Sequence, residues 1–276
     1  MRINSSGMLV QHVLGAALFL PRLLLMTAVE LIAFAVCMAV GILPRSDPSK
    51  PLHPVLQAVV RTVVPPCCRL LVLSVSFWSV SVRGQPAAGT RLFVANHVSI
   101  VDGFLLTAVL GAPSFVARSE GLSAMPLYSS ILRAMQLVFV DRSSASSRRD
   151  AATALVTRAR SSLPFPPMVV FPEGTVSPGG EHLLPFRKGA FTAAVPCQPI
   201  VIRYPSYAFK PEHGLGAEVL SILRLMLRPA TSAEVTFLPV HTPTPEECAE
   251  PAVYAEAVRA AMQQELQEVR ILNTGR

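Results

Sequence analysis

The feature that most constrains this 276-residue chain is a long apolar stretch near its N-terminus, residues 14–43. About 20 apolar residues suffice to cross the ~30 Å hydrocarbon layer of a bilayer. Only Arg22 and Glu30 interrupt this stretch with a charge. A cleavable signal peptide fits less well, because its apolar region usually has about 7–15 residues. We therefore expect the first part of the chain to associate with a membrane.

The sequence leaves the topology of this region open. Pro21 and the two charges could divide the stretch into two shorter helices, which would form a re-entrant or interfacial hairpin in place of a straight span. A second apolar stretch, residues 55–82, ends in SVSFWSVSV, which is more typical of a strand or an interfacial anchor than of a span. We predict a membrane-associated segment over residues 1–82 and a separate folded domain over residues 83–276.

Composition agrees with membrane association and restricts the partners. Hydrophobic residues make up 51% of the chain, charged residues make up 15%, and the formal net charge is +7. Much of the basic excess falls in residues 142–160, which suits an anionic membrane face or a phosphate-bearing ligand, or else a solvated helix face. Nucleic acid is not expected as a partner, because aromatic residues are not interleaved with these arginines.

The five cysteines do not form a metal-binding or disulfide pattern. Their number is odd and no C-x-x-C spacing occurs, which fits a reducing compartment. The adjacent Cys67 and Cys68 could be acylated, although two buried thiols are the more typical interpretation. We expect no bound metal, and the absence of a D-x-D-x-D-G loop predicts no direct control by calcium.

After residue 82, short apolar strands alternate with helical patterns. The candidate strands are LFVA, SFVA, LVFV, MVVF, PIVIR and EVTFLPV, all rich in β-branched residues or bounded by turn residues. This alternation predicts an α/β fold with a largely parallel or mixed sheet. A final helix is expected to begin at the capping box of residues 244–247 and to bury one face carrying Val258, Met262 and Leu266.

The stretch RLFVANHVSIVD, residues 91–102, has two interpretations. Ser99 and Asp102 have the spacing of a capping box, so Asp102 could simply serve the first turn of the next helix. Alternatively, the end of a strand that leads into a helix places His97 at the rim of the sheet, where ligands bind in α/β folds. His97 would then be a general base and Asp102 the carboxylate that orients it.

Three more motifs stand at the ends of apolar strands. Residues 171–175 read FPEGT, an arginine follows LVFVD at position 142, and residues 195–204 form a strand that begins after a proline. Each motif alone is an ordinary turn or surface pair.

Their order along the chain is more specific than any one of them. N-H-x-x-x-x-D, an arginine after a strand, F-P-E-G-T and a proline-initiated strand together resemble the four blocks of the glycerolipid acyltransferase superfamily. The sequences PFRKGAF, QPIVIRYP and EVTFLPVHTPTPEE are similar to its lysophosphatidylcholine acyltransferase-like branch. The resemblance covers roughly residues 14–266. It implies a glycerolipid acyltransferase-like α/β domain with a mixed central sheet and an N-terminal membrane-associated helical segment.

Carried over position by position, the resemblance implies that His97 is the general base and Asp102 its partner. It also implies a set of substrate-binding residues: Arg118, Arg142, Glu173, Gly174 and Thr175. The chain departs from the family pattern at Arg118, where lysine is common, and at Tyr128, Ser129, Ser130 and Met135, where glycines are often found. These departures leave the acceptor specificity open.

The implied function is membrane-bound transfer of a fatty acyl group from acyl-CoA to the free hydroxyl of a lysophospholipid, most of all lysophosphatidylcholine or a related lipid. Acyl-CoA would be a co-substrate, with no permanently bound cofactor. The implied location is the endoplasmic reticulum membrane, with the catalytic domain facing the cytosol. The alternatives are acylation of 1-acylglycerol 3-phosphate or glycerol 3-phosphate, or a catalytically silent membrane scaffold. A serine hydrolase is not expected, since no G-x-S-x-G elbow occurs.

Overall fold

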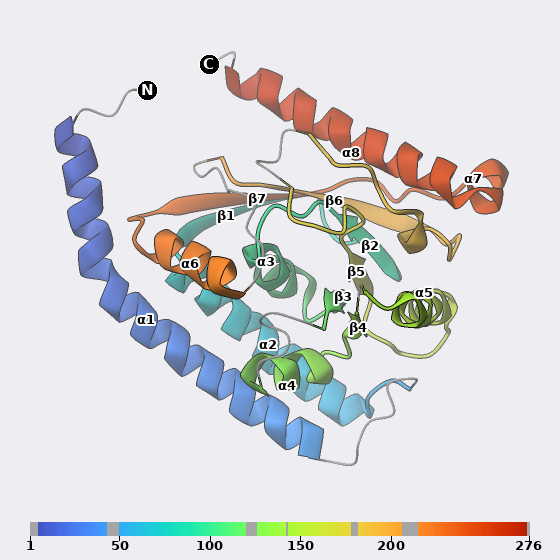
Figure 1. Cartoon of the computed structure of the whole chain (residues 1–276), viewed down its shortest axis with the longest axis horizontal. Coiled ribbons are helices and arrows are strands. Elements are labelled where there is room, and N and C mark those ends of the chain that lie inside the picture. The colour runs from blue at the N-terminus through green and yellow to red at the C-terminus, as the bar shows by residue number, and fades with distance from the viewer. Residues whose placement is uncertain are drawn as a thin grey trace.

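The computed structural model of the chain describes residues 5–42, 50–119, 126–141, 143–177, 182–205 and 215–274. Its centre is a seven-stranded sheet in the order β1-β7-β6-β2-β5-β3-β4, with helices on both faces (Figure 1). Neighbouring strands run parallel except β6 and β7, which are antiparallel. The predicted α/β fold with a mixed sheet is therefore confirmed.

The strands are short and lie close to their predicted positions. They are β1 (Phe77–Arg83), β2 (Leu92–Ala95), β3 (Ser114–Arg118), β4 (Val138–Val140), β5 (Met168–Val170), β6 (Cys197–Arg203) and β7 (Thr231–Phe237). The helices are α1 (Ser5–Ile42), α2 (Pro54–Ser74), α3 (Val101–Leu110), α4 (Pro126–Ala134), α5 (Ala145–Arg160), α6 (Leu215–Met226), α7 (Pro245–Ala249) and α8 (Pro251–Thr274), with a 3₁₀ turn η2 (Lys188–Ala190).

The sheet separates two hydrophobic cores. Alternate residues of a strand point to opposite faces, so Phe93 and Ala95 of β2 join the core beneath α2, α3, α4 and α6. Leu92 and Val94 join the other core, beneath α5 and α8. Both faces of the central strands are covered, which explains why these strands read as continuous apolar runs.

Helix α1 runs without a break through Pro21, so the structure has one long helix where the sequence also allowed two short ones. It lies along the outside of the molecule against α2, α4 and α6 (Figure 1). Gly15 permits this close approach, because a Cβ at this position would lie 1.7 Å from the backbone oxygen of Leu227. Helix α1 is therefore docked onto the α/β domain through its contacts with α2, α4 and α6.

Arg22 shows how a charged residue is accommodated in this apolar helix. Its side chain is 5% exposed, and its guanidinium donates to the backbone oxygens of Met226 and Pro229 at 2.7 Å each and to that of Arg228. The last carbonyls of a helix lack partners within the helix and carry partial negative charge. Arg22 of α1 thus caps the C-terminus of α6 and fastens the two helices together.

The C-terminal helix begins at the predicted capping box, but it is divided. Thr244 and Glu247 exchange the two hydrogen bonds of the box. Helix α7 then ends at Ala249, because Pro251 disfavours helical geometry at Glu250, which is extended (φ −125°, ψ 97°). The prediction of one continuous final helix was wrong at this point. The predicted face is correct, since Val258, Met262 and Leu266 of α8 are buried.

Candidate active site

The candidate site begins where β2 ends, in the middle of the sheet between β5 and β6. Asn96 follows β2 directly and is fully buried; its side chain accepts from the backbone N–H of Ile202 at 2.7 Å and donates to the Ile202 carbonyl at 2.9 Å. This pair of hydrogen bonds extends the β2–β6 connection past the last strand residue. His97 is therefore held at the carboxyl end of a central strand, the usual place for ligands in an α/β sheet.

His97 and Asp102 form a close pair. The Nδ1 atom of His97 lies 2.8 Å from Oδ2 of Asp102, and the Asp102 side chain is wholly buried whereas that of His97 is 23% exposed. The same Oδ2 atom accepts the backbone N–H groups of Val98 (2.6 Å) and Ser99 (2.9 Å). Asp102 thus stabilises the turn that leads into α3 and also contacts the ring of the histidine.

This hydrogen bonding fixes which nitrogen of His97 can act as a base. A carboxylate that accepts from Nδ1 requires the proton on that nitrogen, and so leaves Nε2 as the acceptor. The imidazole also stacks on Phe171, with ring centroids 4.3 Å apart and an interplanar angle of 18°, and Phe171 stacks in turn on Phe115 at 6.1 Å. The imidazole ring is therefore held by a hydrogen bond at its edge and by stacking on its face.

Glu173 supports His97 from the turn after β5. One carboxylate oxygen accepts the backbone N–H of His97 at 2.9 Å, and the other accepts that of Leu184 at 3.0 Å. The side chain is 3% exposed, and this burial raises the pKa of Glu173, although the hydrogen bonds act in the opposite direction. Ser177 adds a backbone bond to the His97 carbonyl at 2.7 Å. The FPEGT turn is therefore joined directly to the backbone of the histidine.

Gly174 allows a basic side chain to lie on this turn. Its φ is +71°, and a Cβ here would be 2.6 Å from Nε of Arg187. The backbone N–H of Arg187 donates to the Pro172 carbonyl at 2.9 Å, and the residue is exposed. The structure thus places an accessible guanidinium beside the turn that carries Glu173.

The remaining predicted site residues are arranged less closely around the pair. Thr175 continues the FPEGT turn and is partly exposed. Arg118 ends β3, which β5 separates from β2. Arg142 lies outside the described residues. Two arginines that the sequence offered for phosphate binding have structural partners: Arg158 is 6% exposed and donates to the Gln136 carbonyl, and Arg160 donates to the Ala193 carbonyl at 2.8 Å.

Tyr204 is the site residue that the sequence analysis did not identify. Its hydroxyl donates to Oδ1 of Asp102 at 2.5 Å, and the residue is 8% exposed. Burial, together with the nearby Asp102 carboxylate, raises the pKa of this phenol well above its usual value. The available signal was its position directly after β6, since the carboxyl ends of the parallel strands β2 and β6 meet at one edge of the sheet.

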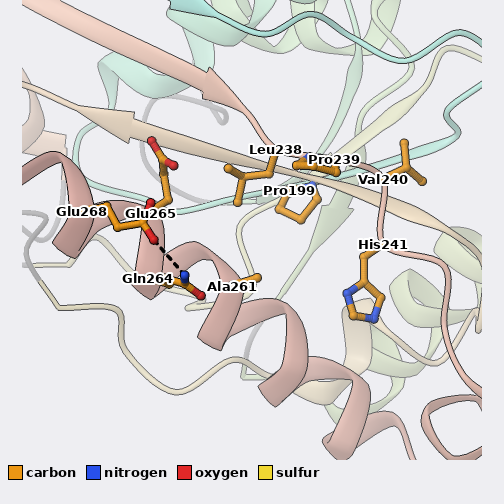
Figure 2. Close-up of a pocket in the computed structure, with 9 residues that line it drawn as sticks. All are labelled: Pro199, Leu238, Pro239, Val240, His241, Ala261, Gln264, Glu265 and Glu268. Atoms are coloured by element: carbon orange, nitrogen blue, oxygen red, sulfur yellow. Dashed lines mark hydrogen bonds between the residues drawn. The ribbon is translucent and has the colours of Figure 1, made fainter.

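A second histidine–carboxylate pair lies elsewhere. Nε2 of His241 is 3.0 Å and 3.1 Å from the two carboxylate oxygens of Glu247. Figure 2 shows His241 at one end of a shallow pocket of about 310 Å³, with Glu265 and Glu268 of α8 at the other. Over the described ranges, no group of three or more His, Cys, Asp or Glu residues is placed to hold a metal ion.

Comparison with known proteins gives consistent matches. Residues 79–203 match the family model described as Acyltransferase. The chain is 38% identical over 208 residues to the human protein named lysophospholipid acyltransferase LPCAT4. This alignment covers 72% of the chain and 38% of the human protein. The chain is also 31% identical over 277 residues to mouse lysophosphatidylcholine acyltransferase 2. This alignment covers 96% of the chain and 49% of the mouse protein.

A solved structure matches the fold. It is the crystal structure of the 1-acyl-sn-glycerophosphate acyltransferase PlsC from Thermotoga maritima, with a TM-score of 0.65 and 20% identity over 93% of this chain and 96% of that one. This chain spans between 38% and 49% of the length of the two curated relatives above.

Proposed function

The chain belongs to the acyltransferase family, and we propose that it transfers a fatty acyl group from acyl-CoA to the free hydroxyl of a lysophospholipid. The observation that carries the proposal is the His97–Asp102 pair at the carboxyl end of β2, in a chain similar to lysophospholipid acyltransferases. Lysophosphatidylcholine or a related lysoglycerophospholipid is the proposed acceptor. Acyl-CoA is the proposed co-substrate, and no permanently bound cofactor takes part.

The proposed reaction is direct transfer with His97 as general base. Nε2 removes the proton of the acceptor hydroxyl while its oxygen attacks the thioester carbonyl, and coenzyme A leaves as a thiolate that takes up a proton. The buried Asp102 carboxylate stabilises the imidazolium that forms in between. A positioned base typically contributes about 10²–10⁴-fold, and holding both substrates in line contributes further.

We assign the phosphate of the acceptor to the basic groups around the FPEGT turn. The exposed Arg187 lies against Gly174, and a planar guanidinium can bind phosphate through two parallel hydrogen bonds. Arg118 and Arg142 remain proposed contributors, with Thr175 offering a hydroxyl. Glu173 is an anion whose oxygens both accept backbone N–H groups, so we assign it to holding the site together.

The N-terminal helices support a membrane-bound enzyme. Two segments, Val13–Ala39 and Pro54–Ser74, are long and apolar enough to cross a bilayer. Exposed apolar side chains are found on α1, on α6 and just after it, and on β1: Leu20, Leu24, Leu31, Ile32, Val219, Leu220, Leu227 and Trp78. Both the lysophospholipid and the acyl chain partition into lipid, whereas acyl-CoA is supplied from the cytosol. We therefore propose a cytosol-facing site at a membrane surface, in the endoplasmic reticulum.

Release of free coenzyme A thiol tests the proposal. Detergent-solubilised protein would be given acyl-CoA with lysophospholipids of several head groups, lysophosphatidic acid or glycerol 3-phosphate. We expect release with a lysophospholipid, lowered about 10²–10⁴-fold by His97→Ala. His241→Ala is the matched control, because it removes the other carboxylate-paired histidine, and its rate should stay within about twofold of wild type.

The acceptor panel separates the alternatives. Release with only lysophosphatidic acid or glycerol 3-phosphate would replace the proposed acceptor and keep the base. A folded protein that releases no thiol with any acceptor would make a silent membrane scaffold the better description. Equal loss in the two histidine variants would contradict the assignment of His97.

A further inference from the structure

We propose that Tyr204 is a positioning residue for acyl transfer: its hydroxyl holds the second oxygen of Asp102, so that this carboxylate stays directed at His97. The inference rests on the proposed function, in which His97 is the base. It adds a third residue, from another strand, to the pair that the sequence predicted. Tyr204 would not touch either substrate and would act through Asp102.

The geometry connects three chain segments through one carboxylate. Oδ2 of Asp102 accepts from Nδ1 of His97 at 2.8 Å, and Oδ1 accepts from the Tyr204 hydroxyl at 2.5 Å. Asp102 is fully buried and Tyr204 is 8% exposed, so water does not screen this contact. The Tyr204 hydroxyl and Nδ1 of His97 thus contact different oxygens of the same carboxyl group.

The Tyr204 ring is itself fixed. It lies 5.3 Å from the ring of Phe77, at an interplanar angle of 55°, and it directly follows β6. Two residues earlier, Ile202 exchanges both of its backbone hydrogen bonds with Asn96, the residue before His97. Movement of Tyr204 relative to His97 is therefore restrained by the β2–β6 connection as well as by packing.

The ionisable groups around the carboxylate support one direction of effect. Burial keeps the phenol of Tyr204 protonated, because its pKa lies well above the usual value, so the phenol donates to Asp102. Glu173 approaches His97 from the turn after β5, and Arg187 lies on that turn over Gly174. From α2, the thiol of Cys68 and the guanidinium of Arg69 form hydrogen bonds with α3 near its C-terminal end.

Loss of the phenol should make the His97–Asp102 pair bind a proton more tightly. Without this donor the Asp102 anion is less stabilised, so either His97 holds its proton more strongly or Asp102 takes one up. Both routes favour the form of the pair that carries the additional proton. Because the base must be unprotonated, activity should fall on the acid side and recover as the pH rises.

The first test is the pH profile of kcat/KM for Tyr204→Phe, which keeps the ring and removes the hydroxyl. We expect the acid limb to move up by about one pH unit, with a roughly tenfold loss below the limb. Tyr254→Phe is the matched control: Tyr254 is also buried, but its hydroxyl donates to the Val195 carbonyl at 2.8 Å. Its acid limb should coincide with that of wild type.

A second variant and a second readout keep the proposal testable if the phenylalanine variant is unstable. Site-specific Tyr204→3-fluorotyrosine retains the hydroxyl but makes it a stronger donor, so the limb should move down by about a few tenths of a pH unit. The imidazole resonance of His97, assigned by its loss in His97→Ala, can also be titrated without substrate. Its midpoint should rise in Tyr204→Phe.

The outcomes distinguish this inference from the proposed function. If wild type transfers no acyl group, the proposed function is wrong, whereas the His97 titration still reports on Tyr204. If wild type is active, and the phenylalanine variant merely scales the whole profile down without moving the limb or the resonance, Tyr204 is structural and the inference is wrong.

Discussion

Within the part of the chain that the structure describes, two histidine–carboxylate pairs occur, His97–Asp102 and His241–Glu247, and their comparison shows what a candidate base requires. Exposure does not separate them. The histidine side chains are 23% and 26% exposed, and the carboxylates are 0% and 8% exposed. Contact distance does not separate them either, at 2.8 Å and 3.0 Å. The difference must lie in orientation and surroundings.

Orientation differs at the nitrogen used. His97 meets Asp102 through Nδ1, the nitrogen nearer its own backbone, so the distal Nε2 does not take part in this contact. His241 contacts Glu247 through Nε2. Glu247 is also the fourth residue of the capping box of α7, so it stabilises the start of that helix as well. The first pair leaves Nε2 of its histidine outside the contact, whereas the second pair uses Nε2 within a local structure.

The surroundings differ in charge. Beside the first pair, Arg187 lies over Gly174 and could attract a phosphate-bearing lipid. At the far end of the pocket that the second pair borders lie Glu265, which is ion-paired with Arg83, and Glu268, whose negative charge would repel such a lipid (Figure 2). A histidine–carboxylate contact alone is therefore weak evidence for catalysis. What distinguishes the His97 pair from the His241 pair is its place at the end of a central strand, near a positive charge.

The largest expected difference between the two pairs appears when the carboxylate of each is replaced with its amide. Asp102→Asn should lower kcat about 10²–10⁴-fold, because an amide cannot stabilise the imidazolium and favours the wrong tautomer. Glu247→Gln should leave kcat within about twofold of wild type. Acyl transfer measured on both variants would contradict the comparison if the two losses were equal.

The support of the histidine backbone gives the next largest effect. The N–H of His97 donates to Glu173, whereas the N–H of His241 donates to the Cys197 carbonyl. Glu173→Ala leaves the N–H groups of His97 and Leu184 without their acceptor, at about 1–3 kcal/mol each. Thermal or denaturant unfolding should show this loss. A variant as stable as wild type would mean that the turn is held by other contacts.

Gly174→Ala tests the charge beside the first pair. The added Cβ meets Arg187, and a non-glycine residue at φ +71° costs about 1–2 kcal/mol. We expect a raised KM for the phosphate-bearing acceptor and a much smaller change in the KM for acyl-CoA. Arg187→Ala is the companion variant, since it removes the cation without straining the backbone. Unchanged acceptor KM in both would place the phosphate elsewhere.

The smallest effect concerns the stability of the second pair as a function of pH. Partial burial acts to raise the pKa of Glu247, but hydrogen bonds from His241 and Thr244 outweigh it and hold this pKa below its usual value. The stabilisation is therefore present above the unfolded pKa of about 4.3 and is lost as the pH falls through the folded value. The free energy of unfolding of wild type should exceed that of Glu247→Gln by about 0.3–1 kcal/mol at pH 7. This difference should disappear near pH 3.

Local patterns account for what the sequence predicted correctly. The strands, the capping box at Thr244 and the His97–Asp102 contact all depend on residues close together in the chain, and the resemblance to the acyltransferase superfamily is confirmed. The contacts of Tyr204 and Arg22 were not predicted, because their partners are 102 and about 204 residues away and no periodicity marks them. The split after Ala249 was missed although Pro251 indicated it.

The Arg22 contact has a consequence for the order of events during synthesis. Its acceptors at the end of α6 lie at least 204 residues further along the chain. At a translation rate of about 5–20 residues per second, they follow Arg22 out of the ribosome after roughly 10–40 s. During that interval helix α1 carries a guanidinium without its native acceptors. The final seating of α1 is thus a late event, completed only when the α/β domain has supplied the carbonyls.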